Sequence, residues 1–151
     1  MPVGWILWEN FFLETTNKLI YMKVTVVVEK QPGEKNCSCF VDEKICKCLV
    51  AGYGPTVDDA VNDLLTNRND LVNLGYDIPD LDMTFKYDIW AFFDKFPISI
   101  TPLAKRIGIN PSLMRQYVSG NRKPSQKRIE EIEAAVHEFG KELSSVSLVR
   151  F

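Results

Sequence analysis

The chain has 151 residues, of which 46% are apolar and 25% are charged, and its formal net charge is −2. This composition is that of an ordinary globular protein, with enough apolar residues for two small cores or one moderate core, and it gives no sign of disorder. The apolar N-terminal stretch is interrupted by Glu9 and Asn10, follows no Lys or Arg and precedes no small-residue cleavage site, which excludes a secretory signal and a membrane span. We therefore expect a cytoplasmic protein.

Residues 1–21 come before the first clear strand pattern, which Met22 opens. We interpret them as an extension outside the domain, such as one produced by an upstream start codon. The other interpretation is an aromatic-rich arm that docks on a partner or on the protein's own fold, through Trp5, Trp8, Phe11 and Phe12. The sequence is compatible with both interpretations.

Three strand-like segments follow. Lys23–Lys30 is rich in β-branched side chains, and the turn residues of Gln31–Asn36 end that strand. Two further strand-like runs, Cys37–Val41 and Cys46–Ala51, flank the polar tip Asp42–Lys44. The pattern predicts a three-stranded meander.

The four cysteines form two Cys-x-Cys pairs within these runs, at Cys37, Cys39, Cys46 and Cys48. Residues two apart on a strand share a face, so a hairpin could bring the four thiols together in a zinc site. Structural zinc ligands are usually spaced by two to four residues on tight turns, whereas these pairs are predicted in mid-strand. We therefore expect free thiols in a reducing compartment, with no metal site and no other cofactor.

A change of period after Tyr53-Gly54-Pro55 predicts a helix. Thr56 is a good N-cap, Asp58 and Asp59 suit a helix N-terminus, and Gly75 ends the pattern. The apolar residues at helical spacing are Val57, Ala60, Val61, Leu64, Leu65, Leu71 and Val72. Apolar residues then alternate in a fourth predicted strand, at Met83, Phe85 and Tyr87, so the predicted order is β-β-β-α-β.

Asp88 is predicted to cap a further helix, which begins a second domain. Its apolar residues lie at i, i+3, i+4 and i+7, and we expect them to pack against the next two helices: Ile89, Phe92, Phe93 and Phe96. Thr101 as N-cap and Pro102 at the first helical position predict a helix that runs to about Ile107, where Gly108 stops it. Asn110 and Pro111 repeat the start signal, and Gly120 ends the second helix.

The segment Ile98–Arg128 holds seven Lys or Arg residues and no Asp or Glu, whereas the rest of the chain holds eleven basic and all twenty acidic residues. A basic helical hairpin can be only a solvated face, but this segregation of charge favours contact with a polyanion. The segment resembles the repressor-type helix-turn-helix, with small Ala104 where the helices would cross and the exit SGNRKP at Ser119–Pro124. The sequence therefore predicts DNA binding.

In that resemblance the second helix enters the major groove with its N-terminal part toward the bases. The base-reading residues are then Asn110, Ser112, Arg115 and Gln116. Pro111 has no polar side chain, so readout is expected to depend on Arg115, which suits guanine, and Gln116, which suits adenine. The predicted phosphate contacts are Lys105, Arg106, Arg122, Lys123, Lys127 and Arg128.

Ser125 is predicted to cap the last helix. Its apolar stripe either packs within the helical domain or forms a dimer seam, and consists of Ile129, Ile132, Val136, Phe139 and Leu143. His137 is the only histidine and is expected on a solvated face. The tail at residues 144–151 carries no motif.

A β-β-β-α-β domain opening at Met22 and followed by a helix-turn-helix resembles the HicB antitoxin family over residues 22–143. The residues that carry the resemblance are Gly54, Thr56, Asp58, Asp59, Ala60 and the exit Gly75–Pro79. The extension at residues 1–21 and the Cys-x-Cys pairs depart from it. The resemblance implies an α+β protein with a partial ribonuclease-H-like domain at residues 22–87, which covers a toxin, and a DNA-binding domain at residues 88–143.

We therefore expect an antitoxin that neutralises a small HicA-like ribonuclease toxin and represses its own operon, as a homodimer or higher homo-oligomer. The acidic residues available to a basic toxin are Asp42, Glu43, Asp58, Asp59, Asp63, Asp80 and Asp82. The alternative is a stand-alone transcription regulator whose N-terminal domain dimerises or senses a ligand. We do not expect an enzyme, because the central strand Val24–Val28 has no carboxylate for two-metal nuclease chemistry and the chain has no phosphate loop or nucleophile elbow.

Overall fold

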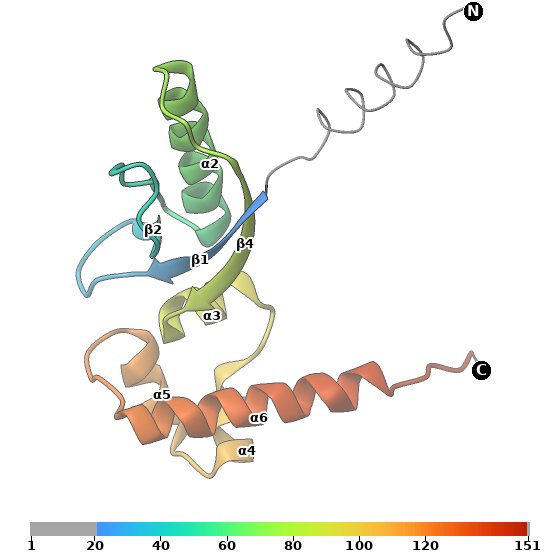
Figure 1. The fold of residues 1–151 in the computed structure, drawn as a ribbon. Helices are drawn as coiled ribbons and strands as arrows, with labels where there is room; N and C mark the ends of the chain where they lie inside the picture. The colour runs from blue at the N-terminus through green and yellow to red at the C-terminus, as the bar shows by residue number, and fades with distance from the viewer. Residues whose placement is uncertain (1–20, 151) are drawn as a thin grey trace, which may run out of the picture.

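The computed structural model describes residues 21–150, which form a mixed α+β structure with one four-stranded mixed sheet and five helices. Both interpretations of the N-terminal extension concern residues that lie almost entirely outside this range. Figure 1 shows α2 beside the sheet, with α4 and α6 at the far end of the molecule. The elements are β1 (Tyr21–Glu29), β2 (Cys37–Val41), β3 (Ala51–Gly54), α2 (Val57–Asn73), β4 (Asp80–Tyr87), α3 (Ile89–Lys95), α4 (Ile100–Ile107), α5 (Pro111–Val118) and α6 (Gln126–Ser144).

The sheet has the strand order β3-β2-β1-β4, in which β1 runs antiparallel to β2 and parallel to β4. Alternate residues of β1 are buried, and these are Val24, Val26 and Val28. Because side chains alternate between the two faces of a strand, the three valines share one face, and they form a core with residues of α2. The helix contributes Val57, Ala60 and Leu64 to that core.

The third strand differs from its prediction. It covers Ala51–Gly54 and not Cys46–Ala51, because Cys46 and Lys47 adopt left-handed conformations in a turn, with φ of 48° and 61°. Gly54, which the sequence placed in a chain break, is a strand residue, as is Gly52. A Cβ on Gly52 would lie 2.2 Å from the backbone oxygen of Ala60, so only glycine allows α2 to approach β3 this closely.

The outer edge of β3 is covered by side chains of α2. The Ala51 N–H donates a hydrogen bond to Oδ1 of Asn67 at 3.3 Å, and the Tyr53 N–H donates to Oδ2 of Asp63 at 2.9 Å. These backbone groups would otherwise be free to pair with another strand. The β3 edge of the sheet is therefore closed.

The other elements of residues 21–87 have the predicted type and order, although β1 begins at Tyr21 and β4 at Asp80, both earlier than predicted. Thr56 caps α2 by accepting a hydrogen bond from the Asp59 N–H, and Gly75, with φ of 94°, follows the end of that helix. Two members of the predicted apolar stripe, Leu65 and Val72, are 37% exposed, so the buried stripe is narrower than predicted. The fourth strand is present and includes the predicted alternation.

We call residues 21–87 the sheet lobe and residues 88–144 the helical lobe. The core of the helical lobe contains Ala104, Ile109, Met114 and Ile132. Helix α3 contributes to both lobes, because Ala91 lies in the core of the sheet lobe whereas Ile89 and Phe93 pack on that of the helical lobe. The predicted packing against the next two helices is therefore present for Ile89 and Phe93, whereas Phe92 and Phe96 pack against each other, and Phe96 also packs against Tyr87 of β4.

Helix α6 begins after Ser125 as predicted, with the Ser125 side chain accepting a hydrogen bond from the Arg128 N–H. The first half of its apolar stripe packs within the helical lobe, where Ile132 is buried. Leu143 near its end is 55% exposed, so the dimer seam stays a prediction for that end alone. His137 is exposed, as predicted. Among residues 21–150, no helix is sufficiently long and apolar to span a membrane.

Candidate nucleic-acid interface

Helices α4 and α5 occupy the basic segment, and Gly108–Asn110 joins them. The predicted N-cap of the first helix is wrong by two residues, because α4 begins at Ile100 after Ser99 and Thr101 lies inside it. Pro102 allows this shift. The N–H groups of a first helical turn have no partner within the helix, so proline is tolerated anywhere in that turn.

The turn has the features that the sequence predicted. Gly108 has φ of 76°, and the Ile109 N–H donates to the carbonyl oxygen of Ala104 at 2.9 Å, which closes the end of α4. Asn110 caps α5, since its Oδ1 accepts a hydrogen bond from the Ser112 N–H at 2.8 Å. Ala104 is fully buried, as expected for a small residue where two helices meet. The two helices are thus held at a defined turn.

The four predicted base-reading residues, Asn110, Ser112, Arg115 and Gln116, are all exposed. Ser112, Arg115 and Gln116 have the i, i+3, i+4 spacing that puts side chains on one face of a helix. The Arg115 guanidinium donates a hydrogen bond to Oγ1 of Thr101 at 3.0 Å, which links α5 to α4. Thr101 therefore orients Arg115. No local sequence pattern marks this contact, because its partners are separated by 14 positions.

The six predicted phosphate contacts fall into two groups. Four are exposed and form no ion pair within the described residues, namely Lys105, Arg122, Lys123 and Lys127. Arg106 donates two hydrogen bonds of 2.7 Å to Glu142, and Arg128 donates one of 2.6 Å to Glu131. The hydrogen bonds between Arg106 and Glu142 raise the pKa of Arg106 and lower that of Glu142.

The structure does not gather the six cations into one cluster. Arg106 lies over the ring of Phe139, at 5.0 Å from its centroid, and pairs with the last turn of α6, whereas Lys127 and Arg128 lie in the first turn. Fifteen residues separate Lys127 from Glu142, which is about 22 Å along a helix at roughly 1.5 Å per residue. Arg106 is therefore separated from the cations at the start of α6.

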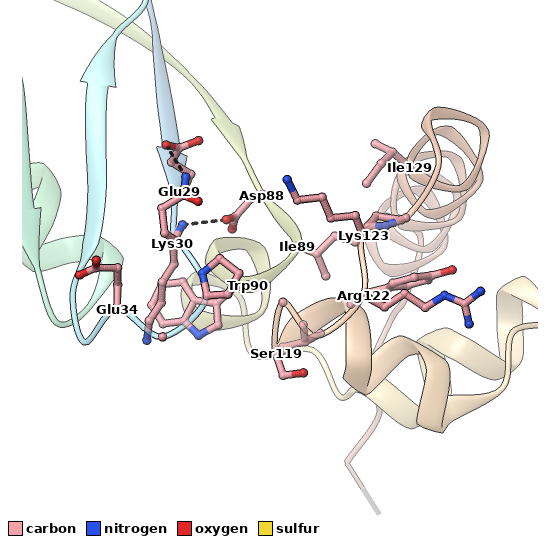
Figure 2. Close-up of a pocket in the computed structure, with 17 residues that line it drawn as sticks. Glu29, Lys30, Glu34, Asp88, Ile89, Trp90, Ser119, Arg122, Lys123 and Ile129 are labelled. Carbon is pink, nitrogen blue, oxygen red and sulfur yellow. Dashed lines mark hydrogen bonds between the residues drawn. The ribbon is translucent and has the colours of Figure 1, made fainter.

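A cleft of about 510 Å³ lies between the lobes, and Figure 2 shows its lining. One wall comes from the loop after β1 and the start of α3, and the other from the loop between α5 and α6, with Arg122 and Lys123. The Lys30 ammonium lies 4.2 Å from the centroid of the Trp90 ring. No local sequence signal marks this cleft, because the loop after β1 and the loop between α5 and α6 are about 90 positions apart.

Asp88 connects the lobes at the back of this cleft. Its Oδ1 accepts a hydrogen bond from the Ala91 N–H, which is the predicted cap, and its Oδ2 accepts one from the Lys30 N–H, each at 2.7 Å. Burial raises the pKa of Asp88, although both hydrogen bonds oppose this effect. The Val57 N–H donates a hydrogen bond to Asp94 at 2.9 Å, so α3 also contacts the start of α2.

Most of the acidic residues predicted to face a toxin already have partners in the sheet lobe. Asp58 pairs with Lys95 and Asp80 with Arg68, while Glu43 accepts a hydrogen bond from the Thr25 N–H, which lowers the pKa of Glu43. Asp63 closes the β3 edge, and Asp59 accepts a hydrogen bond from Thr56. Within the described part of the chain, Asp42 and Asp82 have no ion pair or side-chain hydrogen bond of this kind.

The four thiols do not form one group. Cys37 and Cys39 are buried in β2, where the Cys39 Sγ donates to the Ala60 carbonyl at 3.0 Å, and burial raises the pKa of Cys39 to about 12. Cys46 is exposed in the left-handed turn, so the predicted mid-strand position is right for the first pair and wrong for the second. No three His, Cys, Asp or Glu side chains of residues 21–150 are grouped so that they could hold a metal ion.

The candidate interface thus consists of a capped helix pair with an exposed polar face on α5 and four exposed cations without ion pairs. Glu130 and Glu131 of α6 are the first acidic side chains that follow the basic segment Ile98–Arg128 in the chain. Comparisons of the chain with protein-family models, with curated proteins and with solved structures give no match.

Proposed function

We propose that the protein is a DNA-binding regulator in which α4 and α5 act as a helix-turn-helix. The observation that carries this proposal is the exposed face of α5, where Ser112, Arg115 and Gln116 lie together with no acidic residue in the helix. These side chains include the two best suited to hydrogen bond with guanine and adenine in the major groove. The positive end of the α5 dipole, at Asn110, favours a nearby phosphate.

Arg115 is the main base contact in this proposal. Its hydrogen bond to Thr101 restricts the guanidinium before DNA arrives, so less side-chain entropy is lost on binding. Lys105, Arg122, Lys123 and Lys127 neutralise phosphates, because they can turn toward DNA without breaking an ion pair. Arg106 and Arg128 must first leave Glu142 and Glu131 to do so.

We further propose that the sheet lobe is a partial ribonuclease-H-like domain that neutralises a small HicA-like ribonuclease, and that the protein represses its own operon, as the resemblance to the HicB family implies. The charge of the lobe supports this role, since residues 21–87 hold eleven acidic and seven basic side chains. An acidic surface attracts a basic, RNA-cleaving partner. Asp42 is available for such contacts.

The DNA-binding proposal is tested by fluorescence anisotropy over a range of salt concentrations. The two duplexes are the DNA upstream of the gene that encodes the protein and a scrambled version of it. Arg115→Ala should weaken binding to the cognate site by about 1–3 kcal/mol and relax base preference. Lys105→Ala should weaken binding to both duplexes similarly, and the dependence of log affinity on log salt concentration should become shallower by roughly one. Arg106→Ala is the matched control, with a smaller change in slope than Lys105→Ala. Unchanged affinity and preference in Arg115→Ala would refute the groove assignment.

The toxin proposal is tested by a native pull-down of the chain from its source cell, followed by mass spectrometry. A small basic partner that cleaves RNA only after denaturing separation is the expected result. DNA-bound protein without such a partner would overturn the antitoxin role and leave the regulator.

The interlobe cleft supports a second candidate, a stand-alone regulator that senses a ligand. Its walls belong to the sheet lobe and to the loop that follows α5, so an occupant would contact both lobes (Figure 2). Arg122 and Lys123, proposed here as phosphate contacts, line it. A small molecule that protects the cleft in hydrogen exchange and changes operator affinity would favour this candidate.

A further inference from the structure

The two edges of the sheet differ in a way that points to an interaction surface. The β3 edge is closed by Asn67 and Asp63. The eight-residue strand β4 forms the opposite edge, and among residues 21–150 it pairs in the sheet with β1 alone (Figure 1). An unpaired edge of this length presents a row of free N–H and C=O groups to another strand.

We propose that β4 of a second copy of this chain pairs antiparallel with β4 across a two-fold axis at Thr84, which makes one continuous sheet of eight strands from the two copies. This inference does not depend on the proposed function. It rests on the direction of the backbone groups in β4 and on the order of its side chains.

The backbone groups of β4 alternate in a known phase. The Asp88 N–H donates to the carbonyl oxygen of Val28, so the N–H of residue 88 points toward β1. Because these directions alternate along a strand, the groups of Asp82, Thr84 and Lys86 also point toward β1. Those of Leu81, Met83, Phe85 and Tyr87 point outward. An axis at Thr84 pairs Met83 with Phe85 of the second copy and Leu81 with Tyr87, so outward groups meet outward groups.

The side chains of β4 are complementary in the same register. Asp82 lies opposite Lys86 of the second copy, Thr84 lies opposite Thr84, and the remaining pairs, between Met83 and Phe85 and between Leu81 and Tyr87, are apolar. Asp82 and Lys86 are exposed, and neither forms an ion pair within residues 21–150. Their positions are non-hydrogen-bonded sites of the antiparallel ladder, where opposed side chains are closest.

Neighbouring registers are less favourable. An axis at Phe85 would place Asp82 opposite Asp88, which brings two carboxylates together. An axis at Met83 would place Lys86 opposite Asp80, which already pairs with Arg68 at 2.8 Å. The order of charges in β4 therefore selects Thr84 as the centre, with two equivalent ion pairs around it.

The first test is a cross-link at the axis. In the full chain with Cys46→Ser and Cys48→Ser, Thr84→Cys should form an interchain disulfide under mild oxidation, since opposed residues at such a site have Cα atoms about 4.5 Å apart. Thr25→Cys is the matched control, because Thr25 lies next to Thr84 on the adjacent strand and would be about 14 Å from its mate. Equal cross-linking of the two variants, or none in either, would overturn the proposal.

The second test reverses charges. Sedimentation velocity of the unmodified full chain should show a dimer, and Lys86→Glu or Asp82→Lys should each raise the dissociation constant by about tenfold or more, because two ion pairs become two repulsions. An equimolar mixture of the two variants should dimerise again, since every pair is then complementary. Lys35→Glu, in the loop after β1, controls for net charge.

The mixture also shows that the variants fold, because unfolded chains would not restore a dimer. A monomeric unmodified chain would refute the proposal. Dimers that persist in both single variants would place the interface elsewhere, such as at the exposed end of α6, and would also refute it.

Discussion

The two lobes are stabilised to very different extents by their own cores. The core of the sheet lobe contains thirteen buried residues, whereas that of the helical lobe contains four. The proposed DNA-reading side chains thus lie on the lobe with the smaller core. A domain this small has little apolar area to bury by itself, so its helices depend on the contacts that α3 makes with the sheet lobe. The recognition surface is therefore stabilised in part from outside its own core.

The largest expected loss of stability comes from a substitution in the sheet lobe. Gly52→Ala places a Cβ 2.2 Å from backbone atoms of Ala60 and Leu64, so α2 must move away from β3. We expect the free energy of unfolding to fall by about 3 kcal/mol or more, at the upper end of the range for overpacking. Urea unfolding followed by circular dichroism measures this.

Gly140→Ala is the control in the helical lobe. A Cβ at Gly140 meets nothing within 4 Å, and the residue lies inside α6. We expect stabilisation of up to about 1 kcal/mol from helix propensity. Equal losses at Gly52 and Gly140 would contradict the close approach of α2 to β3.

A smaller loss of stability is expected when the hydrogen bonds that connect the lobes are removed. Asp88→Ala removes the cap of α3 and leaves the Lys30 N–H without its acceptor. We expect a loss of about 2 kcal/mol, and separate unfolding transitions for the two lobes in place of a shared one. Tryptophan fluorescence and far-ultraviolet circular dichroism, compared over the same urea range, report this separation. Asp42→Ala, at an exposed acid, should leave both signals unchanged.

The share of the fold and of the candidate interface that could be predicted from the sequence differs between the lobes. Helix ends marked by Thr56, Asp88, Asn110 and Ser125 were found in the sequence, because a cap is a local signal. The third strand was misplaced because Gly52 is explained only by the approach of α2, a tertiary contact. The exposed residues of α5 were named from the resemblance to the repressor-type helix-turn-helix, whereas the pairing of Arg106 with Glu142 joins positions far apart in the chain.

Thiol reactivity measures how well the core of the sheet lobe is protected from solvent. The buried Cys39 has a pKa of about 12, and Cys46 is exposed. Iodoacetamide at pH 8 should modify Cys46 quickly and Cys39 only on unfolding, as followed by mass spectrometry. The pKa of Cys39 is raised in the folded protein, so its contribution to stability is complete below the ordinary value near 9 and declines as pH rises toward 12. Rapid labelling of Cys39 in the folded chain would contradict the burial.

The smallest effect concerns the exposed pair on the helical lobe. The pKa of Glu142 is lowered by its hydrogen bonds from Arg106, so the contribution of the pair is present above the ordinary value of about 4.5 and is lost as pH falls through the lowered pKa. Glu142→Gln should therefore lower the melting temperature slightly at pH 7, and less than Asp88→Ala does, because exposed ion pairs contribute little. The difference in melting temperature from the unmodified chain should shrink as pH falls below about 4.5. A difference that does not change with pH would assign the effect to packing and not to the ion pair.

The closed β3 edge also sets a limit on assembly. A sheet with two open edges can recruit copies at both ends and grow into a filament, whereas a sheet with one open edge has a single place for a neighbour. Once two copies meet at β4 around a two-fold axis, both remaining edges are β3 edges, already occupied by Asn67 and Asp63. The Asn67 amide and the Asp63 carboxylate of α2 therefore block further strand addition, so that association stops at a finite size and does not continue into a fibre.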